Sequence, residues 1–474
     1  MKDILSAKLF DSRIKSEDIT RKERWLGYFV GPISVMLLNS ILNNYLNVYY
    51  TDVVQLGHVW NGWFLTVFPI VVKVLDALTF LLMGVIVDRF FSRQGVARPW
   101  ILLSAPLLVV SMILLFAFPD GSTTLLVVWI FLSYNLFYSI AYTAYNTAHT
   151  LMVPLSTKDP VQRSQLSVLT NSQGMISGMV VAVLFPTFIV PKLGIDRSSW
   201  IGLMTMIAGA AFPFILLEYY FTRERVTEES RRTAPAPSRE KKERRSLFQQ
   251  LRLCARSRTW VVFMIYLALN QLVSLLSSFS TFYYCNWVLG SYNDGVTQSL
   301  YYAVGNGPLG IGLFLCRPIC KRLGRRNAMV GGFVLAAVGT LLCFLNPQNL
   351  ALVLAGQVVK SIGLIPSTYM VTAMLGDSLD DVEAKTGERC DGFSSSVFNT
   401  LHTLATGLAM CILNLGLTQL GYTAPAADGI IAAQGVAIQQ FFTFCAVGAQ
   451  TIAFPIIALV LMCAPNDKQK GGKS

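Results

Sequence analysis

Long apolar stretches recur along the whole chain, separated by shorter polar segments. Twelve of them reach the ~18 residues that an α-helix needs to cross the hydrocarbon core of a bilayer. They lie at about residues 25–50, 61–87, 99–118, 124–153, 163–190, 199–221, 260–289, 297–316, 326–345, 349–376, 392–419 and 436–463. The short alternating segments typical of transmembrane barrels are absent, and backbone in lipid must then be hydrogen-bonded within helices. The pattern therefore predicts an all-α, polytopic membrane protein with twelve transmembrane helices.

The composition points the same way and narrows the function. Hydrophobic residues make up 53% of the chain and charged residues 14%, which is too apolar for a soluble protein of 474 residues. The sequence has no phosphate-binding loop and no nucleophile paired with a base, and its nine cysteines lack the spacing of a zinc site. We therefore expect no enzymatic activity, no metal and no cofactor.

The longest polar break divides the predicted helices into six and six. It is the proline-interrupted segment "TRERVTEESRRTAPAPSREKKERRS", which has no apolar periodicity. A faint internal repeat supports the division, because "DRFFSRQGVARPW" and "CRPICKRLGRRNAM" each follow the second helix of a half. The predicted parts are a cytoplasmic N-terminal segment at 1–24, a six-helix bundle at 25–221, a basic cytoplasmic linker at 222–259, a second six-helix bundle at 260–464 and a cytoplasmic tail at 465–474.

The positions of lysine and arginine indicate the orientation. With a cytoplasmic N-terminus, the inner segments hold 34 of the 38 Lys and Arg residues, whereas the outer loops hold only Lys192 and Arg197. Cytoplasmic loops retain positive charge, so we expect both termini inside a plasma membrane, which in a bacterium is the cytoplasmic membrane. The net charge of +12 is then a topology signal, and no nucleic-acid partner is expected.

Three segments carry a family resemblance. The stretches "YYTDVVQLG", "GVIVDRFFSRQGVARPWIL" and "GDSLDDVEAKTGERCDGFSSSVFN", with an aspartate inside the second helix, resemble the glycoside-pentoside-hexuronide:cation symporter family, to which melibiose permease belongs. The resemblance implies a major facilitator fold, in which two six-helix bundles rock around a central site. It also implies import of a sugar, a glycoside or a sugar acid, usually in symport with a cation. The alternative is a facilitator of a lipid-like or amino-acid-like solute without cation coupling.

We expect the partners to be this small-molecule substrate and the lipid bilayer, and the protein to be a monomer.

A further question is which ion drives transport. Lys73 and Asp76 stand one helical turn apart inside an apolar run, where a charge is costly unless it is paired, binds an ion or is neutralised by a proton. Their spacing places both on one helix face, either as a structural ion pair or as a cation or proton site.

The resemblance favours the coupling role, because in the family a basic residue precedes the cation-site aspartate by one turn. A second family aspartate falls on Phe80, and a family lysine implicated in coupling falls on Thr403, beside His402. A sodium site needs several oxygen ligands, whereas a proton needs one acceptor. We therefore expect H⁺ rather than Na⁺ as the co-transported cation, or else uncoupled transport. The predicted coupling residues are Asp76, Lys73, His402 and Thr403.

Charges also cluster between the second and third predicted helices, at Asp88, Arg89, Arg93 and Arg98. The bases alone would satisfy the positive-inside rule. Because an acid accompanies them, we favour a gating network on the cytoplasmic side.

Polar residues inside the predicted helices are candidates for substrate contact. Asn39 and Asn43 lie four residues apart on one helix face, which indicates either a wet cavity or hydrogen bonds between helices. The resemblance to the melibiose branch places Asn146 and Asn171 where that branch has an aspartate and an arginine. Lys360 is mid-helix without an acid nearby in sequence, so it either pairs with Asp76 or lines the cavity. The predicted substrate contacts are Asn39, Asn43, Tyr142, Asn146, Asn171 and Lys360.

Overall fold

The computed structural model describes residues 11–89, 92, 94–119, 121–228, 247–292, 294–387, 391–425 and 433–463. These residues form helices joined by short turns, and the one β-bridge among them links Ser92 to Gly95. The all-α prediction is confirmed.

Eleven helical stretches among the described residues are long and apolar enough to cross a membrane. They are Glu23–Val53, Leu56–Gly84, Arg98–Phe116, Thr123–Ser156, Gln165–Leu193, Arg197–Tyr220, Arg258–Leu289, Arg325–Leu345, Leu350–Val371, Val397–Gln419 and Val436–Met462. The remaining predicted span, 297–316, lies inside helix α12 (Gly295–Leu323). The predicted number of twelve is therefore approximately supported.

The described helices fall into two compact units, of which the first comprises residues 1–59, 71–182 and 195–240. Its helices are η3 (Glu23–Val30), α1 (Gly31–Val48), η4 (Tyr49–Val53), most of α2 (Trp63–Arg89), α3 (Arg98–Phe116), α4 (Thr123–Asn135), η6 (Leu136–Tyr142), α5 (Thr143–Ser156), most of α6 (Pro160–Leu184) and α8 (Arg197–Tyr220). Helix α8 packs on α1 and α3, and α3 also packs on α5 and η6. Segments η3, η4 and η6 are π-helical. The spans Glu23–Val53 and Thr123–Ser156 are therefore each built from α-helical and wider turns in succession.

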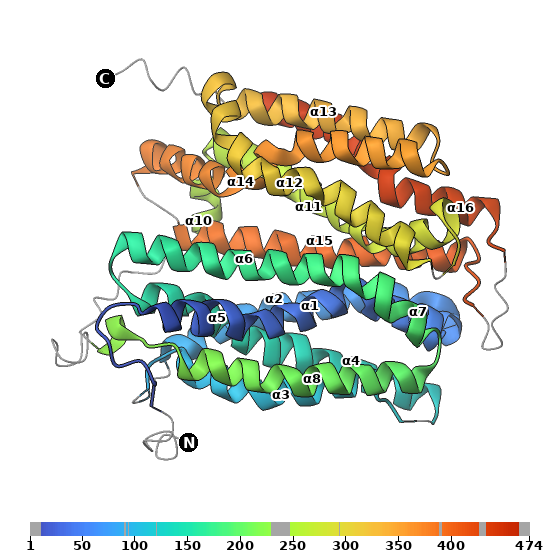
Figure 1. Ribbon diagram of the computed structural model, residues 1–474. Coiled ribbons are helices and arrows are strands. Elements are labelled where there is room, and N and C mark those ends of the chain that lie inside the picture. The colour runs from blue at the N-terminus through green and yellow to red at the C-terminus, as the bar shows by residue number, and fades with distance from the viewer. Residues whose placement is uncertain are drawn as a thin grey trace. The chain divides into compact units, whose positions relative to one another are not determined.

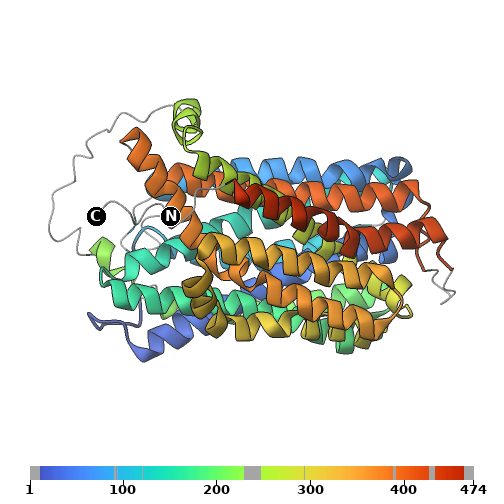
Figure 2. The same ribbon diagram turned by 90° about the horizontal axis from the view of Figure 1, so that it is seen from above.

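The second unit comprises residues 60–70, 183–194 and 241–474. Its helices are η5 (Leu56–Gly62, in part), η7 (Phe185–Ile189), α7 (Val190–Leu193), α10 (Leu247–Cys254), α11 (Arg258–Tyr284), η8 (Cys285–Leu289), α12, α13 (Arg325–Leu345), α14 (Leu350–Thr386), α15 (Asp391–Gln419), α16 (Val436–Thr443), η9 (Phe444–Gly448) and α17 (Ala449–Met462). Helices α12, α13 and α14 run alongside one another (Figures 1 and 2), and α11 packs on α15 and α17. The predicted boundaries 25–221 and 260–464 stay a prediction, and linker residues 229–246 and the tail 465–474 lie outside the described residues.

Short polar side chains begin several of these helices. The side chains of Ser122, Asp196, Ser257, Asp294 and Asn349 each accept a hydrogen bond from a backbone N–H in the first turn. Such caps satisfy donors that the helix itself leaves open. Hydrogen bonds from the hydroxyls of Ser199 and Ser198 and from the backbone of Ser199 lower the pKa of Asp196 to about 2, so this cap stays charged.

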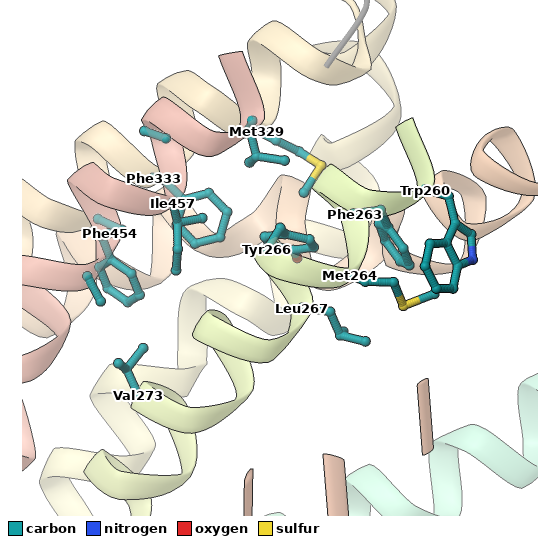
Figure 3. Packing of buried hydrophobic residues seen from close by; sticks show 14 of the residues in the cluster. Trp260, Phe263, Met264, Tyr266, Leu267, Val273, Met329, Phe333, Phe454 and Ile457 are labelled. Atoms are coloured by element: carbon teal, nitrogen blue, oxygen red, sulfur yellow. The ribbon is translucent and has the colours of Figure 1, made fainter. Parts of the chain in front are cut away.

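Aromatic side chains from three helices build the core of the second unit (Figure 3). The ring centroids of Tyr266 on α11 and Phe333 on α13 are 5.8 Å apart, and those of Phe333 and Phe454 on α17 are 5.6 Å apart. These rings are buried and pack edge to face or tilted, which is the favourable arrangement for aromatic pairs.

A seam of glycines brings α13 and α14 into close contact. A Cβ atom on Gly332 would lie 2.3 Å from the carbonyl oxygen of Gly363, and one on Gly339 would lie 2.4 Å from the backbone nitrogen of Lys360. Small residues are the usual means by which membrane helices approach at backbone distance. The seam therefore depends on residues without side chains.

Candidate coupling and substrate site

Lys73 and Asp76 form an ion pair within the first unit. Both lie on α2, and Lys73 Nζ is 2.9 Å from Asp76 Oδ2. Asp76 is 3% exposed, so its negative charge is compensated almost entirely by protein groups. The predicted pairing on one helix face is present.

Two tyrosines enclose the ammonium group. Lys73 Nζ lies 4.3 Å from the ring centroid of Tyr138 and 5.4 Å from that of Tyr134. Tyr134 is on α4 and Tyr138 on η6, and their own centroids are 4.7 Å apart. Cation–π contacts of this kind stabilise a desolvated ammonium by about 2 kcal/mol. The positive charge beside Asp76 is thus the ammonium group of Lys73, a side chain of the protein itself.

The other oxygen of Asp76 lies next to the hydroxyl of Ser139, which has one proton to donate and two acceptor oxygens within reach. Ser139 Oγ lies 2.6 Å from Asp76 Oδ1 and 3.0 Å from Asn135 Oδ1. The Asn135 amide nitrogen donates to the carbonyl of Phe131 at 2.7 Å, which fixes Asn135 Oδ1 as the atom toward Ser139. A serine hydroxyl donates one hydrogen bond, so with Asp76 ionised one of the two acceptors lacks this donor.

The same aromatic cluster reaches two predicted substrate contacts. The hydroxyl of Tyr138 donates to Asn43 Oδ1 on α1 at 3.3 Å, and the ring of Tyr142 stacks on Phe137 at 6.2 Å between centroids. Asn39 and Asn146 are half-buried on α1 and α5. Asn171 is exposed on α6. The structure therefore brings Asn43 and Tyr142 close to the Lys73–Asp76 pair.

The remaining coupling and substrate candidates lie in the second unit. Lys360 is half-buried on α14, and no residue in the described part of the chain forms an ion pair with it. His402 is exposed on α15, and the Thr403 hydroxyl donates to the backbone carbonyl of Asn399 at 3.0 Å. Their predicted roles stay predictions.

Among the predicted gating residues, Arg98 is the one whose side chain the structure describes. Its Nε and Nη2 atoms donate to the carbonyl of Tyr219 at 3.3 and 3.1 Å, and its guanidinium lies 4.7 Å from the ring centroid of Tyr219. Arg98 thereby ties the start of α3 to the end of α8. Asp88 and Arg89 end α2, but their side chains and the whole of Arg93 lie outside the described residues.

Sequence reasoning missed a carboxylate that holds this loop together. Glu224 is buried and accepts hydrogen bonds from the backbone N–H groups of Val96, Ala97 and Arg98 at 2.8, 2.8 and 2.9 Å. It therefore caps α3 from a distant part of the chain. Sequence reasoning also missed Tyr138 and Ser139. The available signal was the spacing of Asn135 and Ser139, which are four residues apart and so share one polar helix face.

Comparison with known proteins gives a consistent assignment. Residues 27–465 match the model of the family described as "MFS/sugar transport protein". The chain is 25% identical over 453 residues to the isoprimeverose transporter of Lactiplantibacillus pentosus, covering 93% of this chain and 88% of that protein. It is 27% identical over 393 residues to the glucuronide carrier protein homolog of Escherichia coli strain K12, covering 79% and 78%.

A solved structure shares the fold. It is a bacterial homolog of the human lysosomal transporter Spinster, in an inward-facing and unoccupied conformation, with a TM-score of 0.62 at 12% identity over 94% of this chain and 98% of that one. At that identity the likeness concerns the fold alone.

Proposed function

Because the chain is a transporter that belongs to the MFS/sugar transport protein family, we propose that it imports a sugar, a glycoside or a sugar acid by alternating access, with a proton as the coupling ion. The observation that carries the choice of ion is the position of Ser139 Oγ between the oxygens of Asp76 and Asn135. The substrate class follows the sugar-transporting relatives.

Protonation of Asp76 completes the hydrogen-bond chain at this site. A proton on Asp76 Oδ1 donates to Ser139 Oγ, and the Ser139 hydroxyl then donates to Asn135 Oδ1. Every acceptor in the chain then has a donor, while Asp76 Oδ2 still accepts from Lys73. Buried polar networks of this kind are favourable when fully satisfied, so the site supports a neutral as well as an ionised Asp76.

Sodium fits the same surroundings poorly. Na⁺ is a hard cation that binds several oxygen atoms, but the position next to Asp76 Oδ2 is taken by the Lys73 ammonium. Phe80, one turn after Asp76, offers no oxygen where the related family has a second aspartate. Electrostatic repulsion from the Lys73 ammonium would oppose a second cation bound to Asp76.

The link to the substrate runs through Tyr138. This residue covers Lys73 with its ring and donates its hydroxyl proton to Asn43, one of the proposed sugar contacts. A change of charge on Asp76 alters the position of Lys73 relative to the Tyr138 ring. This in turn shifts the Tyr138 hydroxyl that donates to Asn43. Proton binding and sugar binding are thereby coupled over a short path within one unit.

We further propose that the substrate bears an acidic group, as a uronide does. Lys360 is a half-buried cation on α14 that pairs with no described carboxylate, and an anionic substrate would offset the cost of its burial. The glucuronide carrier homolog is among the relatives, and a glucuronide has such a carboxylate. We also propose that both termini are cytoplasmic, because the inner segments predicted on that basis hold 34 of the 38 Lys and Arg residues.

The test is the melting temperature of the purified protein over a panel of sugars, each uronide paired with its neutral glucoside. A ligand at 100 times its Kd stabilises by about 2.7 kcal/mol, so binding is visible as a shift. We expect a larger shift with a uronide than with its glucoside, and Lys360→Gln is expected to remove the difference. Lys385→Gln serves as the matched control, because Lys385 is an exposed lysine on the same helix.

Two outcomes count against the proposal. Equal shifts for uronide and glucoside, unchanged in Lys360→Gln, would contradict the acidic substrate. No shift with any sugar, glycoside or sugar acid would contradict the substrate class.

A further inference from the structure

A second buried acid–base pair lies in the first unit. His149 on α5 and Glu218 on α8 are 2% and 1% exposed, and His149 Nδ1 is 2.6 Å from Glu218 Oε1. The hydroxyl of Tyr145, one turn before His149, donates to Glu218 Oε2. Both oxygens of this carboxylate are therefore engaged by α5, and the pair uses none of the residues around Asp76.

The other nitrogen of His149 faces an amide that can serve either protonation state. Gln173 Nε2 on α6 lies 3.5 Å from His149 Nε2, whereas Gln173 Oε1 is buried and has no hydrogen-bond partner among the described residues. In this orientation the amide donates to a neutral imidazole. When the amide turns over, Oε1 faces Nε2 and accepts from a protonated imidazole, so the unpartnered oxygen gains its donor.

The polar and charged groups next to the His149–Glu218 pair have partners of their own. From η3, Tyr28 is engaged with Ser156 and the carbonyl of Met152. Besides Glu218, the charged groups that act on Tyr28 are Glu23 and Arg225, and these form an ion pair at 2.7 Å. From α1, Gly31 approaches the backbone of Glu218 so closely that a Cβ there would lie 2.7 Å from Glu218 N. The described side-chain partners of the Glu218 carboxylate are Tyr145 and His149, and of these two His149 is the one that can carry a positive charge.

The cluster touches the helices that carry the proposed sugar contacts. His149 lies three residues after Asn146 on α5, and Gln173 lies two residues after Asn171 on α6. Gly31 and Asn43 share α1. A rearrangement of His149 and Gln173 would therefore move elements that also position Asn146 and Asn171.

We propose that His149 and Glu218 form a second proton-binding site, separate from Asp76, whose occupancy is linked to sugar binding through α5 and α6. A proton from water binds to His149 Nε2 while Nδ1–H continues to donate to Glu218, and the charge of the pair changes from −1 to 0. Gln173 turns its amide and accepts from Nε2–H. The linkage, but not the site itself, rests on the proposed sugar transport.

The test is nitrogen NMR of protein labelled with ¹⁵N-histidine. The chain has three histidines, so the signals of His149 are assigned by their loss in His149→Gln. We expect the His149 nitrogens to change from a neutral to a protonated pattern as the pH is lowered. Glu218→Gln is expected to remove this change, and Asp76→Asn to leave it in place.

A His149 signal that stays neutral throughout, or one that titrates identically in Glu218→Gln, would overturn the site. If Glu218→Gln does not fold, Gln173→Leu replaces it, because this variant keeps the bond to Glu218 and removes the acceptor for Nε2–H. An unchanged titration in Gln173→Leu contradicts the proposal. A midpoint that does not move when a sugar from the melting panel is added refutes the linkage. This NMR experiment needs no transport, so its failure is distinct from a failure of the proposed function.

Discussion

Substrate affinity in Asp76→Asn is expected to vary less with pH than in the wild type, keeping only the part linked to His149 and Glu218, and accumulation driven by a proton gradient is expected to vanish while exchange of substrate across the membrane persists. In the wild type the affinity should weaken as the pH rises, because coupling requires that the protonated form binds substrate better. Asparagine keeps the hydrogen bond with Ser139 but cannot exchange a proton. The measurement is counterflow and gradient-driven uptake in proteoliposomes, with a sugar from the melting panel.

Asp52→Asn is the control for this prediction. Asp52 is a buried aspartate of the same unit, on η4, and Thr51 donates to it at 2.8 Å. The pH dependence should persist in Asp52→Asn. Retention of proton-driven accumulation in Asp76→Asn, or loss of exchange together with accumulation, would contradict Asp76 as the carrier.

Gly332→Leu is expected to destabilise the second unit by about 3 kcal/mol, because overpacking against a rigid neighbour is costly. The obstacle is the carbonyl oxygen of Gly363, which would lie 2.3 Å from the new Cβ atom and cannot rotate away as a side chain would. Thermal unfolding of purified protein measures the effect. At about 2 to 4 °C per kcal/mol for a unit of this size, the melting temperature should fall by roughly 6 to 12 °C.

The neighbouring glycine supplies a matched control. Gly331 is exposed on the same helix, and a Cβ there would meet nothing within 4 Å. Gly331→Leu should change the melting temperature little, since leucine is also the better helix former. Equal losses in Gly331→Leu and Gly332→Leu would show that the seam between α13 and α14 is not what the substitution disturbs.

The fold was predictable because each transmembrane helix is a long apolar run. Eleven such runs are helices, and membership of a sugar-transporter family is confirmed. The glycine seam was not anticipated. Gly332 and Gly339 lie seven residues apart, as do Gly356 and Gly363, but sequence alone does not say which helices such glycines bring together.

The candidate site was predictable only where it is local in sequence. Lys73 and Asp76 pair because they are three residues apart on one helix. Tyr138 and Ser139 come from η6, a π-helical segment, and wider turns change which side chains face α2 in a way that α-helical periodicity does not predict. Glu218 was overlooked beside His149 because 69 residues separate two side chains that the packing of α5 and α8 brings together.

The most direct test of the account is uptake into proteoliposomes under one ion gradient at a time. The account predicts that an inward proton gradient, without a sodium gradient, drives accumulation of the sugar above its external concentration, and that an inward sodium gradient at fixed pH does not. Uptake that is stimulated by the sodium gradient and indifferent to the proton gradient would contradict it.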